Sequence, residues 1–363
     1  MGIHFARIVA GGVIGMLVAG CAVKKADDGP AVQKAAGEFM PMPAFGTLPA
    51  GRIERLDPAL DVLIPPGAQV EVLVSGLNWC EGPTWVKAGP LTKTPGLLFC
   101  DIPQNTVYKL DPNTRQIEVF VKPSGYTALE PRGGEVGSNG ITIGPDGSLV
   151  LCQHGDRRVA RLAGPQFITI AESYEGKRFN SPNDLVFDRN GNLFFTDPPY
   201  GLEKNMADPK KELDFQGVYR VTPDGKLTLL TKELSRPNGI ALSPDEQTLY
   251  VAVSDPKDAK IWAFDVKADG TLANKRVFFD CQKLVDAGRK GMPDGMEVDR
   301  RGNVFLGGPG GILVFSPAGK HLGTVLTDDK TSNCAWGDDG GTLYMTMNHN
   351  ICRIRTGTKG KGW

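Results

Sequence analysis

Six segments of the chain begin with an oxygen-bearing side chain and then follow one pattern. After the polar residue come Gly or another short residue, a few alternating apolar residues, a turn and a second apolar stretch. The six starts are Glu81, Asn139, Asn183, Asn238, Asp294 and Asn333. If these side chains meet at one point, they form a set of oxygen donors without His or Cys, which suits Ca²⁺ or Mg²⁺. The two carboxylates would balance the charge of such an ion.

Asn-Gly and Asp-Gly pairs are also ordinary turn signals, so a single copy would indicate only a loop. Six matched copies are different, because two of them carry an acid at the same position. A turn has no use for Glu81 before Gly-Pro. We therefore predict that the six starts converge on a cation site. A purely structural role for that cation is the alternative.

The spacing of the starts indicates the elements that position them. Successive starts are 39 to 58 residues apart, which is room for one four-stranded sheet per repeat. We predict an all-β fold, a six-bladed β-propeller with four-stranded blades. The last repeat lacks an outer strand, and we expect Val70 to Val74 to supply it and close the ring. A β-sandwich is the alternative, but it does not explain six matched starts.

The composition is consistent with this fold and excludes some partners. Glycine (46) and proline (27) are abundant, as expected for many short strands joined by tight turns. Forty-one basic residues balance 41 acidic ones, without the basic excess of a nucleic-acid binder. The 40% hydrophobic content is too low for a polytopic membrane protein. We expect a monomer.

The N-terminus is typical of export. Residues 1–21 run from a weakly basic start into a short apolar stretch and end in Val18-Ala19-Gly20-Cys21, which resembles a bacterial lipobox. We predict a signal peptide, a lipid anchor at Cys21 and a location in the periplasm, with a plain cleaved signal or a membrane anchor as alternatives. Residues 22–65 have no sustained period and are predicted to be a flexible tether. The propeller is predicted to span residues 66–358.

The chain from Glu81 onward resembles the gluconolactonase family, which includes senescence marker protein (regucalcin). The likeness is carried by EGPTW from Glu81, CQHGDRRVAR from Cys152, SPNDLVFDRNGNLFFTDPPYGL from Ser181, SRPNGIALSPDEQTLYV from Ser235, PDGMEVDRRGNVFLGG from Pro293 and NCAWGDDGGTLYMT from Asn333. These stretches occur in the right order and touch every blade. The resemblance implies a six-bladed propeller with a divalent cation on its axis.

The resemblance also implies roles for individual residues. It makes Glu81, Asn238 and Asp294 metal ligands, gives Asn183 to the cation or the substrate, and makes Asp294 the general acid/base. We assign Asn139 to substrate as well. Regucalcin-like members carry Arg at the position of Ser181, so the substrate contacts of that Arg are in doubt here. Ca²⁺ is the expected cation, with Mg²⁺ or Zn²⁺ as alternatives.

The implied activity is hydrolysis of a small-molecule sugar lactone. The cation would polarise the carbonyl, and Asp294 would take a proton from water or deliver one to the ring oxygen. A metal-bound hydroxide is the competing account. Two other functions stay open: a phosphotriesterase-like hydrolase, as in the related diisopropyl fluorophosphatase, and a non-catalytic propeller in which calcium only staples the blades.

A few further residues carry expectations. His154 is a candidate substrate contact, with a structural His as the alternative. Asp197 is interpreted as a turn residue, with support of the site as the alternative. Cys80 and Cys100 are a candidate disulfide. The loop from Lys122 to Gly137 and the segment from Gly201 to Gln216 are expected over the channel end, where they would determine specificity.

Overall fold

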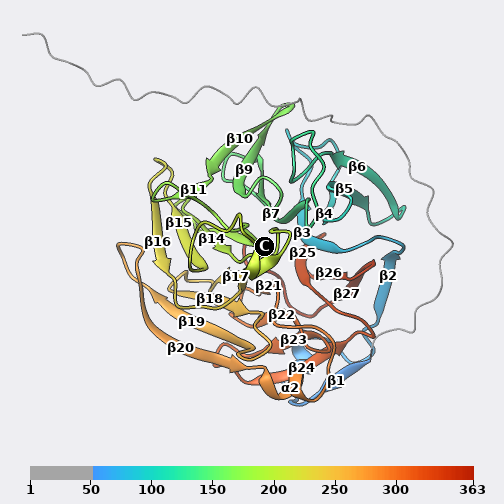
Figure 1. The fold of residues 1–363 in the computed structure, drawn as a ribbon. Helices are drawn as coiled ribbons and strands as arrows, with labels where there is room; N and C mark the ends of the chain where they lie inside the picture. Colours follow the sequence, from blue (N-terminus) through green and yellow to red (C-terminus); the bar gives the residue numbers. More distant parts are fainter. Residues whose placement is uncertain (1–51) are drawn as a thin grey trace, which may run out of the picture.

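The chain forms a ring of six β-sheets around a central axis (Figure 1). The computed structural model describes residues 52–363. Within each sheet, antiparallel strands run outward in order from an innermost strand next to the axis. The predicted six-bladed β-propeller is therefore confirmed. The predicted signal peptide, Cys21 and most of the predicted tether lie outside the described residues.

The blades follow one another along the chain. Blade 1 consists of β3 (Cys80–Val86), β4 (Gly96–Asp101), β5 (Thr106–Asp111) and β6 (Gln116–Val121). Blade 2 consists of β7 (Ser138–Ile143), β8 (Leu149–Gln153), β9 (Arg158–Ala163) and β10 (Gln166–Ala171). Blade 3 consists of β13 (Leu185–Phe187), β14 (Leu193–Asp197), β15 (Gly217–Val221) and β16 (Leu227–Thr231).

The second half of the chain repeats this arrangement. Blade 4 consists of β17 (Pro237–Leu242), β18 (Thr248–Val253), β19 (Lys260–Val266) and β20 (Leu272–Asp280). Blade 5 contains β21 (Met296–Val298), β22 (Val304–Gly308), β23 (Gly311–Phe315), β24 (His321–Leu326) and β1 (Ile53–Arg55). Blade 6 contains β25 (Asn333–Gly337), β26 (Thr342–Met347), β27 (Asn350–Arg355) and β2 (Val70–Val74). The short elements are α1 (Leu60–Leu63), β11 (Ser173–Tyr174), β12 (Lys177–Arg178), the 3₁₀ helix η1 (Asn205–Ala207) and α2 (Gln282–Asp286). None of the helices within residues 52–363 is long and apolar enough to cross a membrane.

The two ends of the propeller are joined in blade 6. The early strand β2 pairs antiparallel with β27 from the end of the chain, with Val70 opposite Ile354 and Val72 opposite Cys352. This is the ring closure that the sequence predicted. Because the outer strand of the last blade comes from the start of the propeller, separating the two ends would break a complete β-ladder.

The apolar core lies between the blades. Six clusters of buried side chains fill the six spaces between neighbouring sheets. The space between blades 6 and 1 is filled like the others, with Trp85 stacked on Tyr344 at 5.6 Å between ring centroids. Each blade therefore buries both of its faces, which is why apolar residues occur on both sides of the inner strands.

The predicted tether is wrong in its last part. Within residues 22–65, the segment from Ile53 to Ile64 is folded: β1 adds a fifth strand to blade 5 by pairing with β24. Leu60 and Leu63 of α1 are buried against the core between blades 5 and 6. A three-residue strand and a four-residue helix are too short to show a periodic pattern, so no signal in the sequence marked them.

The predicted Cys80–Cys100 disulfide is also wrong. All six cysteines of the described chain are buried free thiols. Glu81 pairs directly with Cys100 across the ladder, so Cys80 and Cys100 are one position out of register. Their side chains therefore point to opposite faces of blade 1, Cys80 toward blade 6 and Cys100 toward blade 2.

Glycine at the start of the innermost strands allows these strands to approach the axis closely. A Cβ atom at Gly82 would lie 2.1 Å from the carbonyl oxygen of Asn139, in the next blade. A Cβ at Gly239 would lie 2.1 Å from the carbonyl oxygen of Asp294, again in the next blade. Neither contact is possible for a real side chain. The glycine that follows a polar start is thus required by the packing between blades.

This packing predicts that Gly239→Ala destabilises the ring. The added methyl group must push the backbone of blade 5 away, which should lower the free energy of unfolding by about 1–3 kcal/mol. Urea unfolding followed by circular dichroism measures the change. Gly89→Ala is the matched control, because Gly89 lies in an exposed loop where an added Cβ atom would meet nothing within 4 Å. Equal stability of the two variants would contradict the packing argument.

Candidate functional site

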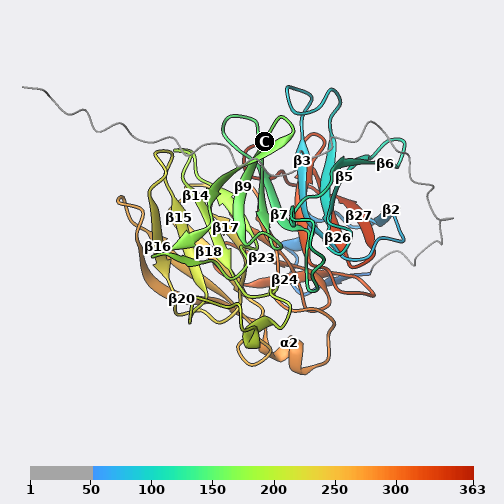
Figure 2. The same cartoon turned by 45° about the horizontal axis from the view of Figure 1, so that its top comes forward.

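A pocket of about 450 Å³ opens at one end of the central channel. Every blade contributes to its wall, and five of the six predicted starts line it: Glu81, Asn139, Asn183, Asn238 and Asp294. The short helix α2 borders this end of the ring, and the C terminus lies at the opposite end (Figure 2). The structure thus brings together the four residues that were assigned to the cation, and Asn139 with them.

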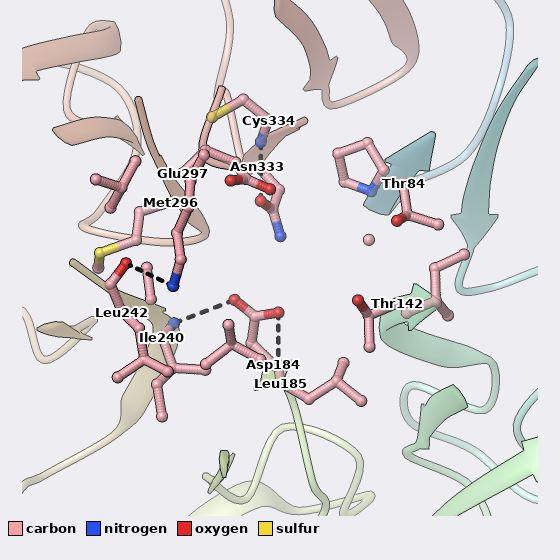
Figure 3. Close-up of a pocket in the computed structure, with 17 residues that line it drawn as sticks. Thr84, Thr142, Asp184, Leu185, Ile240, Leu242, Met296, Glu297, Asn333 and Cys334 are labelled. Atoms are coloured by element: carbon pink, nitrogen blue, oxygen red, sulfur yellow. Dashed lines mark hydrogen bonds between the residues drawn. The ribbon is translucent and has the colours of Figure 1, made fainter. Parts of the chain in front are cut away.

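Asn333 is the exception, because it does not line this pocket. In blade 6 the pocket is lined by the preceding residues, Thr331 and Ser332. The Asn333 side chain instead faces a smaller cavity of about 100 Å³ deeper in the channel, together with Asp184 and Glu297 (Figure 3). The expectation that all six starts meet at one mouth is therefore wrong for Asn333.

Backbone irregularities explain this difference. In blades 1, 2 and 4 the pairing of the innermost strand shifts at the polar start, between Glu81 and Thr84, between Ser138 and Ile141, and between Pro237 and Ile240. Such bulges redirect a side chain out of the regular alternation. In blades 3 and 5 the polar start lies before the strand. Asn333 instead belongs to a regular ladder, because β25 pairs with β26 without a shift from Asn333 to Gly337.

The smaller cavity contains its own buried acids. Asp184 occupies the position after Asn183, where four of the other blades have Gly. Its carboxylate accepts hydrogen bonds from the backbone N–H of Ile240 at 3.2 Å and of Leu185 at 2.9 Å (Figure 3). Burial raises the pKa of Asp184 to about 7. Asp184 therefore links blade 3 to blade 4 where the glycine contact is missing.

Two carboxylates face the pocket without a cationic partner. Glu81 is only 3% exposed, and neither Glu81 nor Asp294 forms an ion pair with a Lys or Arg of the described chain. Burial raises the pKa of Glu81 well above its usual range, and the negative charge of Asp294 raises it further. Burial also raises the pKa of Asp294. Two uncompensated acids in one buried site are costly unless a cation neutralises them.

The donor set fits a hard divalent cation. No three His, Cys, Asp or Glu side chains gather within residues 52–363 in a way that could hold a metal ion. The oxygen donors must therefore include carboxamides beside Glu81 and Asp294. Asn238 is oriented for this role, because its Nδ2 donates to Ser254 Oγ at 2.9 Å, leaving its oxygen free. Oxygen ligands of mixed type are those that Ca²⁺ accepts readily.

Buried aspartates hold the segments that lead into two of the site residues. In blade 3, Asp197 accepts hydrogen bonds from the backbone N–H groups of Asn180 and Ser181, both at 2.8 Å, and from the Asn180 side chain. In blade 1, Asp101 accepts equivalent bonds from Asn78 and Trp79. Each Asn stands three residues before a site residue, Asn183 or Glu81. Asp197 thus supports the site, which was the alternative interpretation from the sequence.

His154 does not reach the pocket, so its predicted contact with substrate is wrong. Its side chain is fully buried, and it is absent from the residues that line the pocket. A Cβ atom at Gly201 would lie 2.7 Å from His154 Cβ, so the segment after the second strand of blade 3 packs directly against His154. His154 touches the site only through Glu135, whose Oε2 lies 2.9 Å from His154 Nδ1.

Several residues of the pocket were not found from the sequence. They are Trp79, Glu135, Tyr200, Arg236, Arg289 and Lys330. Three of them lie within stretches that the sequence analysis names: Arg236 belongs to the SRPNG segment, Tyr200 to the stretch from Ser181, and Glu135 to the loop from Lys122 to Gly137. That loop does reach the channel end, as predicted. The remaining residues gave no signal in the sequence, because single aromatic and basic residues in loops do not belong to a repeat.

Comparisons with known proteins point to one family. Residues 79–349 match the SMP-30/Gluconolactonase/LRE-like region. A gluconolactonase of Zymomonas mobilis is 41% identical over 317 residues, which cover 85% of this chain and 87% of the relative. A solved gluconolactonase of Xanthomonas campestris is similar with a TM-score of 0.72 and 29% identity, covering 90% of this chain and 100% of that one. A regucalcin of Agrobacterium tumefaciens, 20% identical with a TM-score of 0.60 over 80% of this chain and 94% of its own, shares the fold.

The hydrogen bonds that Asp197 accepts from Asn180 and Ser181 predict the effect of Asp197→Asn. The amide that replaces one carboxylate oxygen would face a backbone N–H donor, leaving buried groups unpaired. We expect the free energy of unfolding to fall by about 1–3 kcal/mol, measured by chemical denaturation. Asp214→Asn, in an exposed stretch of the same blade, should leave stability unchanged. An Asp197→Asn variant as stable as Asp214→Asn would show that these hydrogen bonds do not stabilise the fold.

Proposed function

The chain belongs to the SMP-30/gluconolactonase/LRE-like family, and from this premise we propose that it is a lactone-hydrolysing enzyme that acts on sugar lactones. The observation that carries the proposal is the axial pocket, whose wall brings together three carboxylates and three carboxamides. The relatives that match in sequence and fold are named gluconolactonases. The pocket also offers what a sugar lactone needs, because apolar faces such as Trp79 and Met292 stand beside hydrogen-bonding groups.

The site residues that we assign to a divalent cation are Glu81, Asn183, Asn238 and Asp294. The oxygen donors favour Ca²⁺, with Mg²⁺ or Zn²⁺ as alternatives. When bound, such an ion polarises the lactone carbonyl and stabilises negative charge on its oxygen. Within the protein, Ser254 supports this assignment by fixing the carboxamide of Asn238 and donating in turn to the Pro293 carbonyl, next to Asp294.

The substrate contacts that we assign to the chain come from the pocket wall. Asn139 is 5% exposed and carries both a donor and an acceptor for a sugar hydroxyl. Arg236 and Lys330 add donors at the same wall. The substrate contacts of the Arg that regucalcin-like members carry are in doubt here, because Ser181 stands at that position. Ser181 cannot take that place, because its hydroxyl is buried and donates to the Pro198 carbonyl at 2.6 Å.

The role of Asp294 as general acid/base stays a prediction. A carboxylate that shares its charge with a cation binds protons weakly, so one residue would have to serve two opposed purposes. The pocket contains another carboxylate, Glu135, which is not among the ligands assigned above. Ligand binding and proton transfer can therefore be divided between different acids.

Chelation should abolish lactone hydrolysis without unfolding the protein. We expect the hydrolysis of D-glucono-1,5-lactone, corrected for the spontaneous reaction, to fall about 100-fold or more with EDTA and to return with excess Ca²⁺. Glu81→Gln should show the same loss and should also lose the rise in melting temperature that Ca²⁺ gives the wild type. Glu118→Gln, on an outer strand of the same blade, is the control.

The outcomes separate the alternative functions. A chelated protein that stays folded and keeps its rate would refute the cation assignment. Turnover of an organophosphorus triester but of no lactone would favour a phosphotriesterase. If neither class of substrate reacts although Ca²⁺ binds, the protein is a binding propeller.

We also propose that the chain is exported and held in the cell envelope by a lipid on Cys21, on the strength of the lipobox-like residues 18–21. Cys21→Ser should then move the protein from the membrane fraction to the soluble periplasmic fraction, as measured by fractionation and immunoblotting. Retention of the variant in the membrane fraction would exclude this anchor.

A further inference from the structure

We propose that Glu135, oriented by the buried His154, is the group that takes the proton from the attacking water and returns it to the ring oxygen of the lactone. This inference rests on the proposed lactonase function and assigns the proton transfer to a residue that is not among the assigned cation ligands. Glu135 would be the catalytic residue, and His154 would be a positioning residue.

The position of Glu135 is the first observation. It lines the same pocket as Glu81, Asn139, Asn183, Asn238 and Asp294. Its side chain is 39% exposed, whereas Glu81 is 3% exposed. Among the pocket carboxylates of the described chain, Glu135 is thus the one that is not an assigned ligand and that water can reach. A general base needs both properties.

Glu135 shares the pocket wall with Tyr200, whose hydroxyl is buried. Burial raises the pKa of Tyr200, and the negative charges of Asp294 and Glu135 raise it further. Tyr200 lines the pocket, and its buried hydroxyl makes no hydrogen bond of good geometry within the described chain. Tyr200 and Glu135 therefore belong to the wall of one pocket, the volume in which the substrate would bind.

The state of His154 is the second observation. Its ring is completely buried, and neither ring nitrogen makes a hydrogen bond of good geometry. The Nδ1 atom nevertheless lies 2.9 Å from Glu135 Oε2. A buried ring nitrogen without a partner costs free energy, and the Glu135 carboxylate is the acceptor that lies within hydrogen-bond distance of Nδ1. Catalytic hydrogen bonds are often poorly aligned in the absence of substrate.

The loop that carries Glu135 is anchored on both sides, which is the third observation. Arg132 donates to the Gly155 carbonyl at 2.6 Å and to the Gly201 carbonyl. On the other side, the His154 backbone N–H donates to the Gly137 carbonyl at 3.2 Å. A Cβ atom at Gly155 would lie 2.6 Å from the Val136 carbonyl oxygen, so the loop packs directly on this turn. Glu135 is therefore held before substrate arrives.

The chemistry of the step balances with the substrate and water alone. The Glu135 carboxylate takes a proton from water while the water oxygen bonds to the lactone carbonyl carbon. The bond between that carbon and the ring oxygen then breaks, and the proton on Glu135 goes to the departing ring oxygen. The products are the open-chain hydroxy acid and the regenerated Glu135 carboxylate, so no co-reactant is needed.

The test compares Glu135→Gln and Glu135→Ala with Glu130→Gln, which alters an exposed acid in the same loop. We expect kcat of Glu135→Gln to fall about 10²-fold to 10⁴-fold with little change in KM or in the Ca²⁺-dependent melting temperature. Added formate should restore part of the activity of Glu135→Ala, because a small carboxylate can replace the missing base. Glu130→Gln should behave like the wild type.

The role of His154 is tested by a double-mutant cycle. His154→Gln should lower kcat, and the double variant His154→Gln/Glu135→Gln should be no slower than Glu135→Gln alone. Two additive losses would show that His154 acts only on the fold, and would overturn its positioning role. If the ring is needed for folding, His154→Asn with the melting temperature as a check replaces His154→Gln in the cycle.

The remaining outcomes distinguish this inference from the function on which it rests. If the wild type hydrolyses lactones and Glu135→Gln keeps kcat within about threefold, the assignment to Glu135 is wrong and the lactonase function stands. If Glu135→Ala loses activity but formate restores none of it, while KM rises in proportion, Glu135 binds substrate and is not the base. If the wild type hydrolyses no lactone, the proposed function itself fails.

Discussion

The close approach of the six innermost strands to one axis is the constraint on which the rest of the structure depends. Where a strand begins, its backbone lies so close to the next blade that a methyl group at Gly82 or Gly239 would sit 2.1 Å from a carbonyl oxygen. The same approach brings the polar residue before each glycine into the channel. Packing and site are thus two consequences of one geometry, because strands that converge must also bring their side chains together.

Convergence concentrates charge as well as backbone. A protein with 41 acids and 41 bases gathers two buried carboxylates, Glu81 and Asp294, at one end of its axis, where neither forms an ion pair with a Lys or Arg of the described chain. Farther along the channel, Asp184 and Glu297 line a second cavity (Figure 3). Lys361 of the C-terminal segment lines the same cavity. The two cavities differ in the groups that accompany the acids. Carboxamides stand beside the acids in the axial pocket, whereas Lys361 and the inner strands surround those of the smaller cavity.

The first described strand, β1, contacts a residue of the axial pocket. Glu54 on β1 forms two hydrogen bonds, at 2.8 and 2.9 Å, with the guanidinium of Arg289, which lines the axial pocket. The strand that extends blade 5 therefore also fixes one wall of the pocket. The Glu54 carboxylate neutralises the charge of Arg289. Arg236 and Lys330 are then the basic residues of the pocket wall that can interact with a ligand.

By itself the sequence determined the repeat, the number of blades and five of the residues that meet at the axis, because a local pattern recurs six times. It also determined the closing strand Val70–Val74, because the sixth repeat lacks an outer strand of its own. Only the tertiary structure decided which way Asn333 faces, that Cys80 and Cys100 lie on opposite faces, and that His154 is buried behind Glu135. These features depend on bulges, register and loops that cross between blades. A local pattern determines which residues form a strand, whereas the pairing of that strand with its neighbours determines where each side chain points.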